Sequence, residues 1–169
     1  MNIELIQWSE SVLEGIAEIF TRTDRSFLSD GLPMPYTRLH AQDWLERNVL
    51  PREGKNGLYR VILANGKCAG VITMDCKDDV YRQDADIGYL LLPEYSGQGV
   101  MTEALRLFCE ETFQIPDLLR ISARVFSPNA ASRRVLEKNG FLLEGCMRRA
   151  VRKDGNIWDL CIYGKLKGE

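Results

Sequence analysis

The residues best suited to chemistry form a glycine-containing segment that links a predicted strand to a predicted helix. The segment comprises residues 93–104 and has the sequence PEYSGQGVMTEA. Gly97 and Gly99 allow the backbone to approach a ligand closely, and the unpaired amides and positive dipole end at the start of a helix favour a phosphate. These features predict a phosphate or pyrophosphate site that needs no basic side chain, although a G-x-G pattern alone also fits a loop shaped by two glycines.

Two other phosphate-binding patterns do not fit this segment. A P-loop needs Lys and Ser or Thr after its last glycine, whereas Val100 and Met101 follow Gly99. A Rossmann motif needs a third glycine where Thr102 stands and an acidic residue about 20 positions later, where the chain has residues 122–125. The sequence therefore argues against a P-loop and disfavours dinucleotide binding.

A second informative segment lies at residues 126–145 and has the sequence FSPNAASRRVLEKNGFLLEG. Together the two segments resemble the GNAT N-acetyltransferases, and the resemblance covers residues 55–167 well. Within that superfamily, both segments are most similar to the branch that acetylates the N-termini of ribosomal proteins (RimJ/RimL-type).

The resemblance implies that acetyl-coenzyme A is the co-substrate and that backbone groups hold most of it. The amides from Gln98 to Thr102 would hold the pyrophosphate, and backbone groups of Leu91 and Leu92 would line the pantetheine arm. Asn129 would touch that arm and would also cap its helix. Glu94 stands where the superfamily has a basic residue, which removes one cationic contact. The implied cofactor-binding residues are Leu91, Leu92, Gly97, Gln98, Gly99, Val100, Met101, Thr102 and Asn129.

Two residues are candidates for proton transfer in the implied reaction. Ser132 is the candidate to protonate the leaving thiolate, because Leu136 stands where many GNAT enzymes have a tyrosine. Asp86 is the candidate to accept the proton of the amine, alone or through water, because it matches the acidic residue that precedes the family's Ile-Gly-Tyr. The alternatives are an ordinary helix hydroxyl for Ser132 and a paired edge-strand carboxylate for Asp86.

Other reactive side chains lack partners in the sequence. His40 is the only histidine and is expected on the exposed side of a helix. Cys109 and Cys146 have no evident histidine partner, so the sequence indicates direct transfer without a covalent enzyme intermediate. The basic run at residues 147–153 is expected to be the solvated face of a hairpin.

The N-terminal part of the chain is predicted to contain one strand and two helices. Residues 2–8 are typical of a strand, and Ser11 with Glu14 predicts the capping box of an amphipathic helix. Thr37 is expected to cap a second helix. The stretch between them, residues 24–36, contains one glycine and two prolines and is a candidate substrate lid.

The remaining elements alternate between strands and helices. Asn65-Gly66 and Asp154-Gly155 each predict a hairpin with a type I′ turn. With the resemblance, the element order β-α-α-β-β-β-α-β-α-β-β predicts an α/β GNAT fold as a single domain over residues 1–169, with a mixed, mostly antiparallel, bent central sheet. We expect coenzyme A between the strands at 84–92 and 119–126, where they splay apart. The expected elements are strands at 59–64, 67–76, 84–92 and 120–126 and helices at 102–113 and 129–138.

Composition narrows the classes of partner. The net charge of -2, with 45% hydrophobic and 27% charged residues, supplies no broad basic field for nucleic acid or an anionic membrane. Five cysteines without a C-x-x-C pair indicate reduced, mostly buried thiols, and we expect no metal site and a cytoplasmic protein. The oligomeric state stays open, with a dimer as one possibility.

The sequence therefore predicts an acetyl-CoA-dependent N-acetyltransferase that acts on a primary amine, with a protein N-terminal α-amine as the favoured acceptor. Two alternatives stay open. A polyamine or aminoglycoside acetyltransferase would use the acidic cluster of Asp78, Asp79, Asp84 and Asp86 to attract its substrate. A non-catalytic acyl-CoA-binding sensor is the other alternative, because the cofactor motif is clearer than any acid or base.

Overall fold

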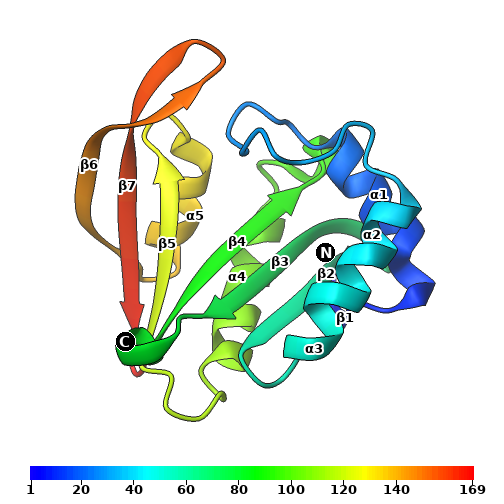
Figure 1. The fold of residues 1–169 in the computed structure, drawn as a ribbon, viewed down its shortest axis with the longest axis horizontal. Helices are drawn as coiled ribbons and strands as arrows, with labels where there is room; N and C mark the ends of the chain where they lie inside the picture. The colour runs from blue at the N-terminus through cyan, green and yellow to red at the C-terminus, as the bar shows by residue number, and fades with distance from the viewer.

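One seven-stranded sheet organises the chain, as described by a computed structural model of residues 1–169 (Figure 1). The strand order is β1-β2-β3-β4-β5-β7-β6, and all neighbouring pairs are antiparallel except β4 and β5, which are parallel. The predicted α/β fold with a mixed, mostly antiparallel sheet is confirmed. The strands are β1 Ile3–Gln7, β2 Gly57–Ala64, β3 Lys67–Cys76, β4 Asp84–Leu91, β5 Arg120–Phe126, β6 Leu142–Lys153 and β7 Asn156–Leu166.

Helices cover both faces of the N-terminal part of this sheet. Along β2, Tyr59 and Val61 pack with α1 and α2, whereas Leu58 and Ile62 pack with α4 on the opposite face. Because successive side chains of a strand point to opposite faces, a strand covered on both sides is buried along its whole length. The helices are α1 Leu13–Arg22, α2 Arg38–Trp44, α3 Leu50–Arg52, α4 Val100–Thr112 and α5 Ala130–Lys138, with a π-helical turn at Leu45–Val49.

The strands β4 and β5 separate halfway along their length, which opens the sheet (Figure 1). They pair only from Asp84 to Ile87 of β4 and from Arg120 to Ala123 of β5. Beyond this point β4 continues to pair with β3 and β5 continues to pair with β7. The predicted splay between these two strands is therefore present, and it divides the sheet into two parts.

The helix starts agree with the sequence where a side chain caps the helix. The Thr37 Oγ1 atom accepts from the His40 amide at 3.4 Å, and the Asn129 Oδ1 atom accepts from the Ser132 amide at 3.2 Å. The predicted capping box at Ser11 is wrong, because α1 begins at Leu13 after a 3-10 turn and the Ser11 hydroxyl bonds to that of Ser9.

The α4 helix begins at Val100 rather than at Thr102. Gly99 takes a φ of 80° at the N-cap, a conformation that glycine adopts at little cost, and it turns the chain directly into the helix. The turns at Asn65-Gly66 and Asp154-Gly155 have positive φ at both central residues, as a type I′ turn requires.

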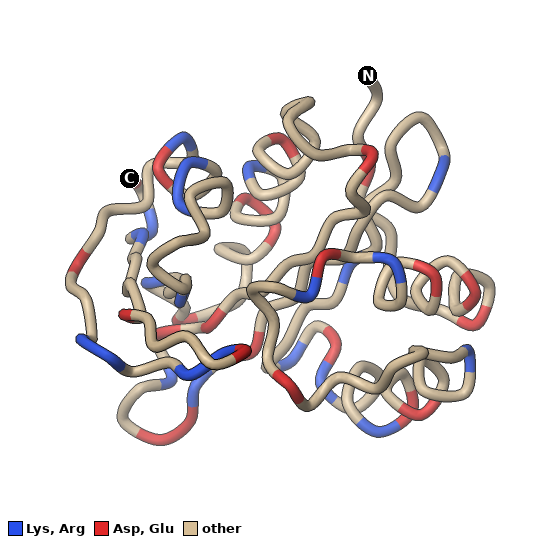
Figure 2. The backbone as a smooth tube through the Cα atoms, turned by 90° about the horizontal axis from the view of Figure 1, so that it is seen from above, with Lys and Arg blue, Asp and Glu red and all other residues tan.

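The five cysteines are free thiols, but they are less buried than predicted. Cys109 and Cys161 are buried, whereas Cys146 is exposed because it lies on the edge strand β6. Acidic and basic residues are interspersed over the whole fold, in keeping with the small net charge (Figure 2). The structure contains no helix with both the length and the apolar character needed to cross a membrane.

Candidate active site

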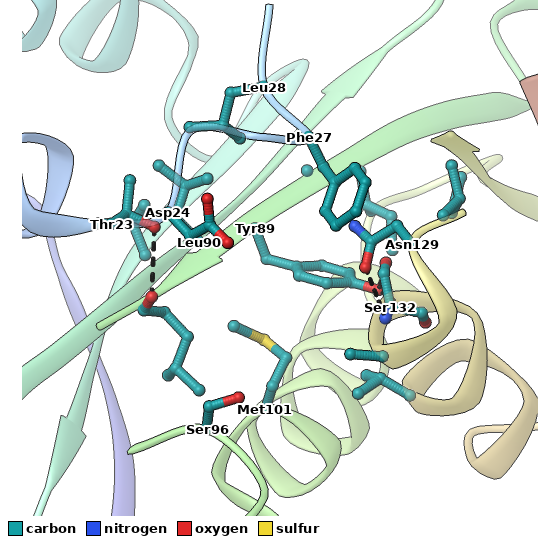
Figure 3. A pocket seen from close by; sticks show the side chains of 18 of the residues that line it. Thr23, Asp24, Phe27, Leu28, Tyr89, Leu90, Ser96, Met101, Asn129 and Ser132 are labelled. Atoms are coloured by element: carbon teal, nitrogen blue, oxygen red, sulfur yellow. Dashed lines mark hydrogen bonds between the residues drawn. The ribbon is translucent and has the colours of Figure 1, made fainter. Parts of the chain in front are cut away.

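A cavity of about 790 Å³ occupies the splay between β4 and β5 (Figure 3). Its walls are the ends of these two strands, the start of α4, one side of α5 and the loop at residues 24–36, which was the candidate lid. Of the predicted site residues, those that line the cavity are Leu91, Gly97, Gly99, Val100, Met101, Thr102, Asn129 and Ser132.

The start of α4 presents a row of backbone amides to this cavity. The six amides from Gly97 to Thr102 donate to no backbone or side-chain acceptor in the protein. The first turn of a helix has no earlier carbonyl to bond, so its amides carry uncompensated partial positive charge. Gly97 and Gly99 have φ values of 75° and 80°, and no other atom lies within 4 Å of where a Cβ would stand on either. Free amides and open space beside both glycines are the features that a pyrophosphate site needs.

Two basic side chains line the same cavity as this turn, and no sequence pattern indicated them. Arg134 and Lys138 of α5 line the same cavity. The Asn139 Nδ2 atom donates to the Thr102 carbonyl at 3.1 Å and ties the end of α5 to the start of α4. Because α5 was predicted only as a helix with an N-cap, its position beside α4 could not be derived from its own pattern.

Glu94 stands where the family has a basic residue, and its ion pair gives it a structural role. Its carboxylate pairs with Arg22 of α1, at 2.9 Å between Oε1 and Nη2, and it does not line the cavity. The side chain therefore serves the contact between α1 and the segment before α4.

Of the predicted cofactor residues, Leu92 does not face the cavity, and Gln98 offers only the backbone amide that was predicted. Leu92 is buried against α1 and α2, and its amide donates to the Ala69 carbonyl at 2.8 Å, so it does not line the cavity. Backbone groups alternate in direction along a strand, so those of Leu91 point away from β3 and toward the splay. The Gln98 side chain bonds to the Glu94 carbonyl at 2.5 Å and lies outside the cavity, and only its amide belongs to the row at α4.

Ser132 lies within hydrogen-bond distance of the Tyr89 hydroxyl, which was not among the predicted site residues (Figure 3). Its Oγ atom lies 2.7 Å from the Tyr89 Oη atom, and Asn129 fixes its amide. Burial raises the pKa of Tyr89 to about 12, so this hydroxyl keeps its proton at neutral pH. Leu136, at the position of the family tyrosine, is fully buried in the core. The only signal for Tyr89 was its place in the Ile-Gly-Tyr motif of β4.

Asp86, the candidate to accept the amine proton alone or through water, does not line the cavity. It lies opposite Ser122 in the paired part of β4 and β5, next to the pair Ile87 and Ala123, which line the inner end of the cavity. Its carboxylate is 3.6 Å from Lys77 Nζ and 3.9 Å from Arg124 Nη2.

The acidic cluster that motivated the polyamine alternative also lies outside the cavity. Asp84 is buried, accepts from the Ser122 hydroxyl at 2.8 Å and pairs with Lys77 at 2.5 Å. Asp78 and Asp79 belong to the 3-10 turn before β4. Asp84 therefore stabilises the paired part of β4 and β5, and no member of the cluster lines the cavity.

The loop at residues 24–36 closes one side of the cavity and is anchored at its far end. Phe27 contacts Trp158 of β7, with ring centroids 5.6 Å apart. Asp30 pairs with Lys153 at 2.6 Å, and this lysine is buried, so the prediction of a fully solvated basic run is wrong at Lys153. The loop thus bridges α1 and the β6-β7 hairpin across the splay.

Comparisons with known proteins agree with this geometry. The family model described as "Acetyltransferase (GNAT) domain" matches residues 2–142. The "Putative ribosomal N-acetyltransferase YdaF" of Bacillus subtilis is 35% identical over 114 residues, which are 68% of this chain and 62% of that protein. The chain spans less than half of the length of two further relatives from the same bacterium. The ribosomal-protein-serine acetyltransferase of Escherichia coli is 25% identical over 168 residues, which are 98% of this chain and 93% of that protein.

A solved structure of RimL, a ribosomal L7/L12 alpha-N-protein acetyltransferase in complex with coenzyme A, has a TM-score of 0.84 to this chain. The alignment covers 98% of this chain and 94% of that one at 23% identity, and a likeness at this identity shows the fold. Since the family model also covers most of the sequence, the chain belongs to the GNAT acetyltransferase family.

Proposed function

We propose that this protein is an acetyl-CoA-dependent N-acetyltransferase that transfers the acetyl group directly to a primary amine, with a protein N-terminal α-amine as the acceptor. The observation that carries the proposal is a single cavity that contains both the free amides of Gly97 to Thr102 and the Tyr89–Ser132 hydroxyl pair. One end fits a pyrophosphate, and the other offers polar groups for a reacting thioester.

The protein would hold acetyl-CoA mainly through its backbone. Acetyl-CoA supplies its acetyl group as a thioester, and an amine readily attacks the carbonyl carbon of a thioester. The amides at the start of α4 would bind the pyrophosphate, and Arg134 and Lys138 would add charge complementarity to its phosphates. The Leu91 amide, which points into the splay, would donate to the thioester carbonyl oxygen as negative charge develops on it.

The chemical step would depend on positioning and on one directed proton. The amine nitrogen forms a bond to the carbonyl carbon while the carbon–sulfur bond breaks. Ser132 would donate a proton to the departing sulfur, and Tyr89, 2.7 Å away, would hold the Ser132 hydroxyl in position. Because a free thiol has a pKa near 8.5, the sulfur can leave with only partial proton transfer.

The choice of acceptor rests on two observations. The E. coli relative that aligns over almost the whole chain is named for acetylation of a ribosomal-protein serine. The acidic cluster that would attract a polyamine lies outside the cavity. Both favour a protein N-terminus, and the hydroxyl pair favours an enzyme over a sensor.

The test is an acetylation screen with the full chain. Acetyl-CoA would be offered with peptides that begin with serine, with spermidine and with an aminoglycoside, while released thiol is measured and the products are analysed by mass spectrometry. We expect one acetyl group on the peptide α-amine. Tight acetyl-CoA binding without turnover on any amine would support the sensor instead.

A further inference from the structure

The cavity contains a single carboxylate, that of Asp24, on the loop at residues 24–36. Figure 3 shows this side chain entering the cavity beside Leu90 and Tyr89, across from Ser132 and Asn129. The other charged residues of the lining are basic and lie on β5 and α5: Arg124, Arg134 and Lys138. The cavity is thus basic along β5 and α5 and acidic on the side of the loop.

The carboxylate of Asp24 is held in place by its own loop. Its Oδ1 atom accepts from the Ser26 amide at 2.9 Å and from the Ser26 hydroxyl at 2.7 Å. These bonds lower the pKa of Asp24 below its usual value, so it is ionised at neutral pH. The preceding residue, Thr23, donates from Oγ1 to the Leu91 carbonyl at 3.2 Å, which fixes the start of the loop against the end of β4.

Asp24 forms no ion pair within the protein. The neighbouring Arg22 pairs with Glu18 and Glu94. The other neighbour, Arg25, donates to the carbonyls of its own loop and of α1, with acceptors Phe20, Leu32 and Pro33. Arg22 and Arg25 are therefore both bonded to other groups, and the Asp24 carboxylate is available to pair with a cation in the cavity.

We propose that Asp24 binds the acceptor amine as an ammonium ion and holds its nitrogen next to the thioester. This inference rests on the proposed function and names the group that selects its substrate class, a cationic primary amine. Asp24 acts as a positioning residue and stays ionised throughout. The ammonium releases one proton to water, and the neutral amine then forms the carbon–nitrogen bond as the carbon–sulfur bond breaks. The second nitrogen proton is lost to solvent, the sulfur receives its proton from Ser132, and Ser132 recovers a proton from water, so one proton is released in total.

This arrangement predicts a specific effect on pH dependence. A carboxylate beside an ammonium stabilises the charged form and raises the pKa of the amine. Removing the charge should therefore lower that pKa, so the rise of kcat with pH should occur at lower pH. The neighbouring hydroxyl of Tyr89 has a pKa of about 12 and keeps its proton through pH 6 to 9, and the remaining charged groups of the lining are the three basic residues named above.

The experiment compares Asp24→Asn with wild type on a peptide that begins with serine. We expect KM for the peptide to rise about 10- to 100-fold, the scale of a lost hydrogen bond to a charged group. The affinity for acetyl-CoA by calorimetry should stay the same, and the kcat profile should move to lower pH. Asp24→Glu keeps the charge and should recover part of the loss. Asp43→Asn removes the same charge from an Arg47 ion pair on α2, away from the cavity, and should behave as wild type.

The outcomes separate this inference from the proposed function. Unchanged KM and an unchanged pH profile in Asp24→Asn, with an active wild type, would overturn the role of Asp24 alone. A wild type that acetylates no amine would overturn the proposed function. If Asp24→Asn does not fold, Ser26→Ala removes the hydroxyl bond to the carboxylate. A severalfold rise of peptide KM in that variant supports the inference, and no rise overturns it.

Discussion

The wall of the cavity at the end of β4 and the start of α4 presents backbone groups, whereas the wall formed by residues 24–36 presents side chains. The six amides from Gly97 to Thr102 are free, and all of these residues except Gln98 line the first wall. The second wall offers the Asp24 carboxylate and apolar groups such as those of Phe27 and Leu28. A backbone site needs only the right dihedral angles, so many sequences can build it, but a side-chain site changes with each substitution.

The two walls suit the two different substrates of the proposed reaction. Every acetyl-CoA molecule is the same, so a fixed backbone site suits it. A loop that carries individual side chains can be altered without disturbing the sheet, so it suits an acceptor that has to be recognised by its own groups. Variants on the first wall should therefore act on the affinity for acetyl-CoA, and variants on the second wall on KM for the amine.

The largest effect is expected on the backbone wall, from Gly99→Val. Valine is strained at a φ of 80°, and its side chain would enter the open space in front of the free amides. We expect acetyl-CoA binding to be lost, by calorimetry, while the circular dichroism spectrum stays that of a folded protein.

Gly54→Val is the matched control for Gly99→Val. Gly54 has a φ of 72° with open space around it and lies outside the cavity. It should show a similar loss of stability with unchanged affinity for acetyl-CoA. Wild-type affinity in Gly99→Val would remove the phosphate-cradle interpretation.

A smaller effect is expected between the two walls, from Ser132→Ala. The substitution removes the hydroxyl 2.7 Å from Tyr89 and leaves the amide bond to Asn129 intact. Because the dipole of α5 and the low pKa of a thiol already assist the departing sulfur, we expect kcat to fall only about 10- to 100-fold at saturating acetyl-CoA. Tyr89→Phe should lower kcat less, since Ser132 keeps its hydroxyl. An equal kcat in Ser132→Ala, with chemistry shown to be rate-limiting, would leave Ser132 as an ordinary helix residue.

The side-chain wall should respond to Phe27→Ala. Phe27 links the loop to Trp158, and Trp158 contacts Phe126 at 6.0 Å between ring centroids. Loss of a central aromatic contact in a binding site often costs about tenfold in affinity. We expect KM for the peptide to rise by about this factor, with the acetyl-CoA affinity unchanged. A change confined to acetyl-CoA binding would contradict the division between the two walls.

The sequence predicted most features that depend on a few adjacent residues, with the capping box at Ser11 as an exception. The Asn129 cap, the two type I′ turns and the glycine turn before α4 are each determined by local backbone preferences, and all were found. The contact between Tyr89 and Ser132 joins residues 43 positions apart and depends on how far the sheet opens. The sequence also showed no sign of Asp24, because a loop pattern does not reveal which of its side chains enters a cavity.

The smallest effect is expected from Asp86→Asn, which tests where the cavity ends. If Asp86 accepted the amine proton, its loss would lower kcat by roughly 100-fold or more. The structure instead places its carboxylate beside Lys77 and Arg124, in the paired part of β4 and β5. Partly exposed ion pairs contribute at most about 1 kcal/mol to stability, and this carboxylate does not line the cavity. We therefore expect kcat to change by less than about fivefold across pH 6 to 9. The assay is the same peptide acetylation run beside Asp24→Asn. A loss near 100-fold in Asp86→Asn, with normal KM for the peptide, would instead support Asp86 as the acceptor of the amine proton, alone or through water.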